Sequence, residues 1–339
     1  MNDDQYWRSE QLVEVLHGTF GFHPGWRAVH GEGRIYAGTF TATPEAKQYT
    51  RAVHMQGDPI PVTVRFSYAF PDAPNRPAAG QCGMATKFYL PNGQVTDLIG
   101  LSTALFPFPT PEDVLDLLST IRDPATGEPD PARVQPWFAD HPASARALQI
   151  NLSKPPYANF AQAEFHAMHA FRFVNAAEEA RYARYQWIPE AGRASTTIEE
   201  LRQRGESYFF DDLEERLRSA PVAYSLVLQL AEEGDPTNDP SAPWPEEREM
   251  VTIGRLELTR PTSNEEIGDP VMLHDPTRVT DGIETPDDPV LHARRGVYEA
   301  SVADRTGGWK GREGALEREA AQKREAAEQA NPPPAESSE

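Results

Sequence analysis

Apolar and polar side chains alternate with a period of two in several stretches of this chain, and this alternation restricts the fold more than any other feature. It is clearest in RIYAGTFTAT (residues 34–43) and IPVTVRFSYAF (residues 60–70). Successive side chains of an extended strand point to opposite faces, so each stretch would bury one face. The same pattern returns in HAFRFVN, ARYARYQWIPE, VAYSLVLQLAEE and MVTIGRLELTR.

The connections between these strands indicate the fold class. The stretch MATKFYLPNGQVTDLIG (residues 84–100) predicts two strands, because Pro91, Asn92 and Gly93 favour a turn between them. The strands do not alternate regularly with helices, as the crossovers of a parallel sheet would require. We therefore expect an α+β protein dominated by antiparallel β-structure, with helices inserted or packed outside.

Helical patterns occupy other parts of the chain. Residues 110–123 predict a helix with Thr110 as its N-cap and Pro111 at its first position. Residues 196–219 predict a highly charged helix, and the proline-rich residues 122–160 an ordered excursion. The expected organisation has three parts: an N-terminal helix (1–20), a folded core (21–305) and a charged helical or disordered tail (306–339).

The charge and the single cysteine exclude several classes of function. The chain has 32 Lys and Arg against 52 Asp and Glu, a formal net charge of −20, which repels phosphate backbones and anionic lipid. We therefore expect neither nucleic acid nor a membrane as a partner. Cys82 alone forms neither an intrachain disulfide nor a cysteine-based zinc cluster. The acidic start and the lack of about 20 consecutive apolar residues predict a cytoplasmic location.

Two segments in the first quarter of the chain carry candidate functional residues. In GWRAVHGEG (residues 25–33), Arg27 and His30 share a site only if the glycines bend the chain, and a turn histidine is the simpler interpretation. Arg65 and Ser67 lie two apart and hence on one face of a strand. Because an unpaired buried charge is costly, Arg65 needs an anionic partner unless it forms a surface salt bridge.

Two histidines in EFHAMHAFRF would suit a metal pair if this segment were helical. His166 and His169 are three residues apart, a spacing whose side chains diverge on a strand. We therefore discount a zinc or non-haem iron site at this position.

A helix is expected near the end of the core, in ETPDDPVLHARRGVYEAS. Asp287, Asp288 and Pro289 are typical of a helix start, and Arg294 and Tyr298 then lie one turn apart as neighbours. A guanidinium beside a phenol stabilises the phenolate, which is a competent ligand for ferric iron. A surface Arg–Tyr stack is the alternative.

Taken together and in chain order, these segments resemble the monofunctional haem catalase family. GWRAVHGEG resembles the segment with the distal histidine, and PVTVRFSYAF the strand with valine, arginine, phenylalanine and serine. The strand pair at 84–100, the hairpin HAFRFVNAAEEARYARYQW and the run ending in ARRGVY follow in the same order. The resemblance covers roughly residues 20–300 and is closest to the compact catalase-related peroxidases. It implies an eight-stranded antiparallel β-barrel with inserted and flanking helices.

The resemblance also implies haem b as the cofactor and a role for each candidate residue. Tyr298 would be the iron ligand, with Arg294 holding it ionised. His30 would move a proton between the peroxide oxygens, with Ser67 orienting its ring. The remaining residues would bind the porphyrin, two through its propionates and one near the distal face: Arg27, Arg65 and Phe106.

One position departs from the family pattern. The distal asparagine is expected after the glycine of the Asp-Leu-x-Gly run, where this chain has Leu101. Leucine cannot hydrogen-bond the second peroxide that catalase turnover requires. We expect a haem peroxidase that reduces hydrogen peroxide or organic hydroperoxides through an oxoferryl state, with an organic reductant and weak catalase activity. The family habit also suggests a possible homodimer.

Two other functions are compatible with the same fold. One is a fatty-acid hydroperoxide isomerase or lyase resembling allene oxide synthases, which have threonine before the distal histidine where this chain has Val29. The other is a non-catalytic haem-binding protein, for which a distal acid–base such as His30 would be superfluous.

Overall fold

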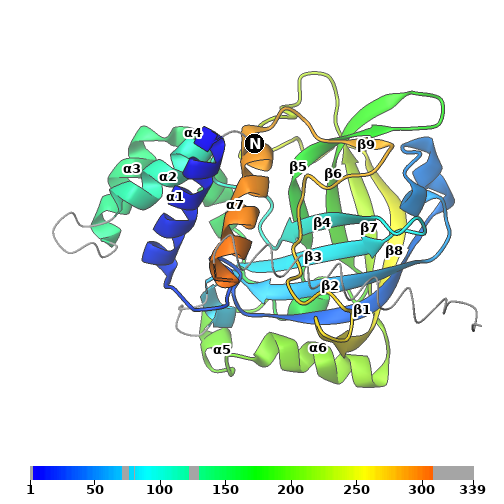
Figure 1. Cartoon of the computed structure of the whole chain (residues 1–339), viewed down its shortest axis with the longest axis horizontal. Coiled ribbons are helices and arrows are strands. Elements are labelled where there is room, and N and C mark those ends of the chain that lie inside the picture. The colour runs from blue at the N-terminus through cyan, green and yellow to red at the C-terminus, as the bar shows by residue number, and fades with distance from the viewer. Residues whose placement is uncertain (1–2, 71–75, 80, 122–129, 308–339) are drawn as a thin grey trace, which may run out of the picture.

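A closed antiparallel barrel forms the centre of the protein in the computed structural model, which describes residues 3–70, 76–79, 81–121 and 130–307 (Figure 1). Eight strands follow one another around the barrel, and pairing of the fourth with the fifth closes it. The strands are β1 (Gly33–Ala42), β2 (Ile60–Tyr68), β3 (Cys82–Tyr89), β4 (Val95–Leu101), β5 (Phe165–Val174), β6 (Ala180–Pro189), β7 (Val222–Leu230) and β8 (Met250–Thr262). A short strand, β9 (Ile283–Glu284), extends the sheet beside β5. The predicted eight-stranded α+β fold is confirmed.

The alternating side chains fill the barrel with aromatic rings. Phe66 of β2 stacks on Phe160 with 4.9 Å between ring centroids, and Phe165 and Tyr224 pack against the same ring. All four side chains are fully buried. Because neighbouring positions on a strand face opposite ways, the residues on either side of Phe66 point out of the barrel.

Helices cover part of the outer wall. The described residues contain α1 (Asp3–Phe20), α2 (Pro111–Thr120), α3 (Val134–Asp140), α4 (Pro142–Leu152), α5 (Ile198–Arg202), α6 (Tyr208–Ser219) and α7 (Pro289–Arg305). Figure 1 shows α1 beside α7, with α2, α3 and α4 grouped on the side of α1 away from the barrel. Thr110 caps α2 in a capping box with Asp113, as its position predicts.

Some helical boundaries differ from the sequence expectations. The proline-rich excursion contains α3 and α4, which strand and helix periodicity did not indicate, and residues 122–129 lie outside the described residues. The charged helix expected at 196–219 is two helices, because the chain turns around Gly205. The helix expected at Pro289 begins there and has 17 residues. Of the predicted tail, residues 308–339 lie outside the described residues.

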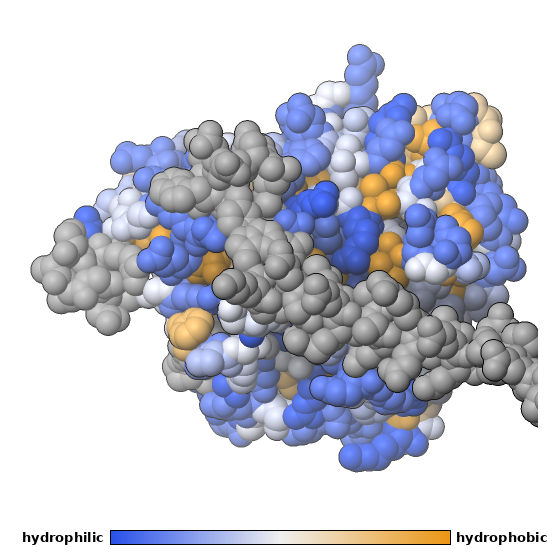
Figure 2. Space-filling view, in the orientation of Figure 1, coloured by the Kyte–Doolittle hydropathy of each residue, from blue (hydrophilic) through white to orange (hydrophobic). Residues whose placement is uncertain are grey.

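The surface agrees with the composition. In the view of Figure 2, hydrophilic residues predominate and apolar residues form separate patches. None of the helices in the described ranges has the length and apolar character needed to cross a bilayer.

Candidate functional site

A cavity of about 770 Å³ lies between the outer wall of the barrel, α7 and the helices α1, α2 and α4. This volume is in the range of protein cavities that hold cofactors and ligands, roughly 300–1,000 Å³. The lining contains all seven residues that the sequence analysis selected: Arg27, His30, Arg65, Ser67, Phe106, Arg294 and Tyr298. Arg27 and Tyr298, which are 298 − 27 = 271 residues apart in the chain, therefore meet at one site.

His30 is held in a strained backbone conformation on the barrel wall. Its φ is 57°, and its backbone N–H donates to the carbonyl of Ala69 (2.9 Å). Its Nδ1 lies 3.1 Å from the hydroxyl of Ser67. A Cβ on Gly83 would lie 2.8 Å from Nδ1 and 2.9 Å from that hydroxyl, so a side chain there would displace the ring. The lack of a side chain at Gly83 thus creates the space for the His30–Ser67 pair.

The environment of His30 keeps its imidazole neutral. Burial is the largest cause and the positive charge of Arg65 the next, with further contributions from Arg294 and Arg27, and together they lower the pKa of His30 to about 3. A neutral imidazole has one nitrogen free to accept a proton, which is the requirement for a general base.

The tyrosine on α7 is held by an arginine one turn earlier. Nε and a terminal nitrogen of Arg294 donate to the Tyr298 hydroxyl oxygen over 3.1 and 2.5 Å. Asp288 caps this helix by accepting from the backbone N–H groups of Val290 and Leu291. Two charge-assisted hydrogen bonds to one oxygen stabilise a phenolate, as the spacing suggested.

The chain of contacts extends beyond the predicted residues to His169 and Asp288. His169 Nε2 lies 2.9 Å from Arg294, and its Nδ1 lies 2.7 Å from Asp288. Because a guanidinium only donates, Nε2 must accept, so Nδ1 carries the proton and donates to the carboxylate. Burial lowers the pKa of His169 to about 4, which favours this neutral tautomer.

A bulge in β5 explains why strand alternation did not predict this contact. The register shifts between His166 and Ala170, and Met168 has a φ of 59°. His166 and His169 consequently border the same cavity, although regular alternation would place them on opposite faces. The geometry therefore differs from the divergence that the sequence analysis expected of this pair.

Three arginines meet on another side of the cavity, where carbonyls are the only partners that the described residues offer their charges. Arg27 donates to the carbonyl of Met272 (2.5 Å), and Arg65 to that of Gly31 (2.9 Å). Arg305, which the sequence analysis did not select, also contacts Met272 (3.3 Å), and its Nε is buried without a hydrogen-bond partner among the described residues. Among the described residues, no carboxylate lies within ion-pair distance of these three guanidiniums.

The pKa values of this arginine cluster reflect its unpaired charge. Burial and then the charge of Arg65 lower the pKa of Arg27 well below its usual range. Burial and then the charge of Arg305 lower the pKa of Arg65 to about 9. Burial also lowers the pKa of Arg305 itself. The cluster therefore needs an anionic ligand, which agrees with the expectation from the sequence that a buried Arg65 needs an anionic partner.

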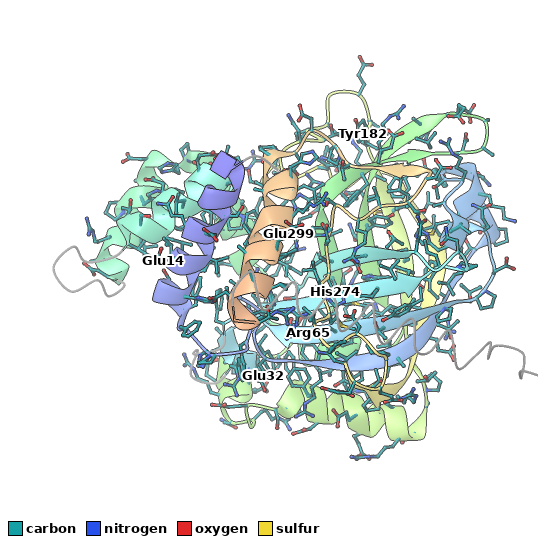
Figure 3. All side chains as sticks on the ribbon, viewed as in Figure 1. Glu14, Glu32, Arg65, Tyr182, His274 and Glu299 are labelled. Carbon is teal, nitrogen blue, oxygen red and sulfur yellow. The ribbon has the colours of Figure 1, made fainter. Side chains whose placement is uncertain are left out.

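Two further residues of the lining differ in how easily the sequence identifies them. Phe106, which it did identify, packs its ring on Phe108 with 5.4 Å between centroids. His274, which it did not, is buried near Arg65, and its Nε2 has no hydrogen-bond partner among the described residues (Figure 3). Burial lowers the pKa of His274. No spacing rule connects His274 to the other candidates.

A β-barrel with an arginine-bound tyrosine, a neutral imidazole across the cavity and a cluster of free arginines has the features of a haem-binding protein. The model of the Catalase family matches residues 25–311, and the chain belongs to this family. It is 38% identical to a catalase-related peroxidase of Mycolicibacterium paratuberculosis over 301 residues, which are 88% of this chain and 95% of the relative. A catalase-related peroxidase of Synechococcus elongatus is 34% identical over 88% of this chain and 89% of its own length. Catalase-2 of Bacillus subtilis is 28% identical over 83% of this chain and 44% of its own length.

Membership of this family implies a haem, and the described residues fit one. The Tyr298 oxygen is a hard anionic ligand once ionised, which suits ferric iron. The arginine cluster, with the unpartnered Nε of Arg305, suits the carboxylates on the rim of a porphyrin. The many apolar side chains in the lining suit the porphyrin plane.

Proposed function

We propose that this protein is a haem-dependent peroxidase that reduces hydrogen peroxide or organic hydroperoxides with an organic reductant. The observation that carries the proposal is the position of the His30–Ser67 pair and the Arg294–Tyr298 pair in one cavity. The catalase-related peroxidases among the relatives support it. When bound, the haem supplies a ferric iron whose redox chemistry breaks the peroxide O–O bond.

In this proposal Tyr298 would hold the iron as a phenolate when the haem is bound. Arg294 stabilises the phenolate with its two N–H groups. Asp288 fixes the tautomer of His169, and the ring of His169 accepts a hydrogen bond from the Arg294 guanidinium. Arg294 would lose this hydrogen bond if it rotated away from Tyr298.

His30 moves the proton of the peroxide in this mechanism. Its neutral ring accepts the proton from the first peroxide oxygen and returns the same proton to the departing second oxygen. The departing group leaves as water or an alcohol. Ser67 keeps the ring in the orientation for both transfers through its contact with Nδ1.

The arginine cluster binds the carboxylates of the cofactor. We assign Arg27, Arg65 and Arg305 to the two propionates of haem b, because three unpaired guanidiniums match two carboxylates better than one. Phe106 lines the cavity and contributes apolar contact to the porphyrin. The cytoplasmic location and the homodimer stay predictions.

Weak catalase activity follows from Leu101. This residue faces Gly83 in the β3–β4 ladder and so lies next to the His30 ring. A catalase must hold a second peroxide as the reductant, and a leucine offers it no hydrogen bond. The hydroxyl of the next residue, Ser102, already accepts from the backbone N–H of Cys82 (2.9 Å).

The test is to purify the protein with haem supplied and record its absorption spectrum, then oxygen evolution and dye oxidation. We expect a high-spin ferric spectrum and dye oxidation with hydrogen peroxide and with cumene hydroperoxide. A protein without a high-spin ferric band would refute the proposal. Vigorous oxygen evolution by the unmodified protein would refute the argument from Leu101. The matched gain-of-function test is Leu101→Asn, which should evolve oxygen faster than the unmodified protein.

The same preparation distinguishes the two alternative functions. An isomerase or lyase would consume a fatty-acid hydroperoxide without oxidising a dye and without any other external reductant. A haem carrier would bind haem and leave peroxide unchanged, although the neutral, oriented imidazole of His30 serves no purpose in passive binding.

A further inference from the structure

His166 lies in the same row of the barrel wall as the residues around His30. Ser67 pairs with Gly83, Gly83 with Leu101, and Leu101 with His166 across β2, β3, β4 and β5. Residues directly opposite one another on antiparallel strands point to the same face of a sheet. The face of this row is the cavity face, because the Ser67 hydroxyl contacts His30 there. His166 therefore presents its ring to the cavity, and it contributes to the lining.

The imidazole of His166 is free to bind a ligand. None of the described residues forms a hydrogen bond with it, and burial lowers its pKa to about 4, so it is neutral with one donor and one acceptor. The nearby carboxylate of Glu164 is already engaged by Arg193 (2.5 Å) and by the hydroxyl of Tyr157 (3.2 Å). An unpartnered polar group in an enclosed site gains most from a ligand that completes its hydrogen bonds.

The row also fixes the spacing between the two imidazoles. Neighbouring strands lie about 4.8 Å apart, so the backbone of His166 is about 10 Å from that of Gly83, beneath His30. A peroxide group is far shorter than this spacing, so His166 does not act on the oxygens that His30 handles. Leu101 lies between them and offers apolar contact. The arrangement suits one substrate with two polar ends.

Lys154 indicates which chemistry the second end has. It lies just beyond α4, is exposed at the cavity lining, and acts electrostatically on His166. No ion pair with a described residue neutralises it. In a chain with a net charge of −20, an unpaired ammonium at a cavity edge selects for an anion.

We propose that His166 and Lys154 form a second polar subsite that binds the carboxylate of an organic substrate, whose reacting group lies at His30 and whose apolar part covers Leu101. The inference rests on the proposed peroxidase function only for the identity of the reacting group. Two kinds of molecule share this chemistry: the hydroperoxide of an aliphatic acid and an aromatic acid that acts as the reductant.

Calorimetric titration of the haem-loaded protein with ω-hydroxydecanoic acid and its methyl ester tests the subsite without turnover. We expect the acid to bind at least about tenfold more tightly than the ester, the effect of one charge-assisted hydrogen bond. His166→Phe and Lys154→Met should each abolish the preference and leave ester binding within about twofold. His166→Gln, which keeps a donor, should retain much of it. Lys47→Met, at an exposed lysine outside the cavity lining, should change nothing.

Kinetics then identify the source of the carboxylate. If the hydroperoxide supplies it, Lys154→Met raises KM for hydroperoxydecanoic acid and not for its ester; if the reductant does, KM rises for para-hydroxyphenylacetic acid and not for its ester. Equal affinity of acid and ester for the unmodified protein overturns the subsite, and so does a preference that survives both substitutions. A protein that prefers the acid and lacks peroxidase activity refutes the proposed function and supports the subsite. An active peroxidase without this preference for the acid refutes the subsite and supports the proposed function.

Discussion

The two sides of the cavity are built in opposite ways. On the α7 side, Asp288, His169, Arg294 and Tyr298 form a continuous chain in which every member has a partner. On the other side, Arg27, Arg65 and Arg305 donate only to backbone carbonyls among the described residues, and none of these residues is a partner for the Nε of Arg305. A buried charge is costly until an opposite charge joins it. The α7 side is thus complete before a ligand arrives, and the arginine cluster is completed by the ligand.

A buried ion-pair network holds the segment that the arginine cluster contacts. Asp97 lies 2.9 Å from Arg278 and 3.7 Å from Lys87, whose ammonium also donates to the carbonyl of Leu273 (2.9 Å). These contacts attach the chain around Met272 to the outside of β3 and β4. The carbonyl of Met272 is therefore fixed where it can accept from two arginines, which keeps their guanidiniums in place without neutralising them.

The strongest test of the complete side is Tyr298→Phe. The substitution removes the oxygen to which Arg294 donates and leaves the helix and its packing unchanged. We expect loss of haem binding, or loss of the ferric tyrosinate spectrum, because no other described residue of α7 replaces the ligand. The measurements are the ratio of haem to protein after purification and the absorption spectrum.

Tyr182→Phe is the matched control for this prediction. Tyr182 is a half-buried residue of β6 that does not line the cavity, and its loss should leave haem content unchanged. Normal haem content and an unaltered spectrum in Tyr298→Phe would show that the α7 chain does not hold the iron.

His30→Ala separates binding from chemistry. The protein should keep its haem and react with peroxide about a hundredfold to ten-thousandfold more slowly, the usual contribution of a positioned general base. Ser67→Ala, which leaves the base and removes its partner, should slow the reaction only about fivefold. Stopped-flow mixing with peroxide measures both, and an unchanged rate in His30→Ala would contradict the role of His30.

The lowered pKa of His30 adds a pH dependence to the same experiment. A histidine with an ordinary pKa near 6.5 would be protonated at pH 5 and lose about thirtyfold in the concentration of its basic form. With a pKa of about 3, His30 stays neutral from pH 7 down to pH 5. The rate of the peroxide reaction should therefore change less than about twofold over this interval.

Local patterns were sufficient to locate the strands and the contact between Arg294 and Tyr298, whereas the closed barrel and the roles of the other site residues followed only from the family resemblance. Period two located the eight strands, and the turn of helix between Arg294 and Tyr298 predicted a contact that the structure has. His169 escaped prediction because its partner Asp288 is 119 residues away and because the bulge at Met168 changes the direction of its side chain. Arg305 and His274 were not predicted as site residues, because the path of the chain around Met272 depends on tertiary ion pairs. No spacing in the sequence encodes such a route.

Asp288→Asn tests the far end of the complete side. Asparagine can still accept from the first backbone N–H groups of α7, so the helix cap is retained. Its amide is a poorer acceptor for the N–H of His169, and the other tautomer of that ring would face the N–H groups of Arg294. We expect haem affinity to fall about tenfold to a hundredfold, as for other residues that orient a metal ligand.

Transfer of haem to apomyoglobin measures this affinity through the dissociation rate. Asp287→Asn is the control, because this exposed neighbour carries the same charge and does not reach His169. Equal dissociation rates in the two variants would mean that the chain behind Arg294 is structural packing and does not support the tyrosine.

Arg305→Met tests the incomplete side, and its two effects should have opposite signs. Without haem, the substitution removes a buried cation that raises the energy of its neighbours Arg27 and Arg65, so the free energy of unfolding should rise by about 1 kcal/mol. With haem, it removes a charge-assisted partner of a propionate, so haem affinity should fall about tenfold. Denaturant unfolding of the haem-free protein and haem transfer measure the two quantities.

Arg295→Met is the control, at an exposed arginine of α7 that lies 3.4 Å from Glu299. It should alter neither quantity by more than a few tenths of a kcal/mol. If Arg305→Met instead destabilises the haem-free protein and leaves haem affinity unchanged, the arginine is a clamp on the carbonyls near Met272, and the contrast between the two sides of the cavity fails at this residue.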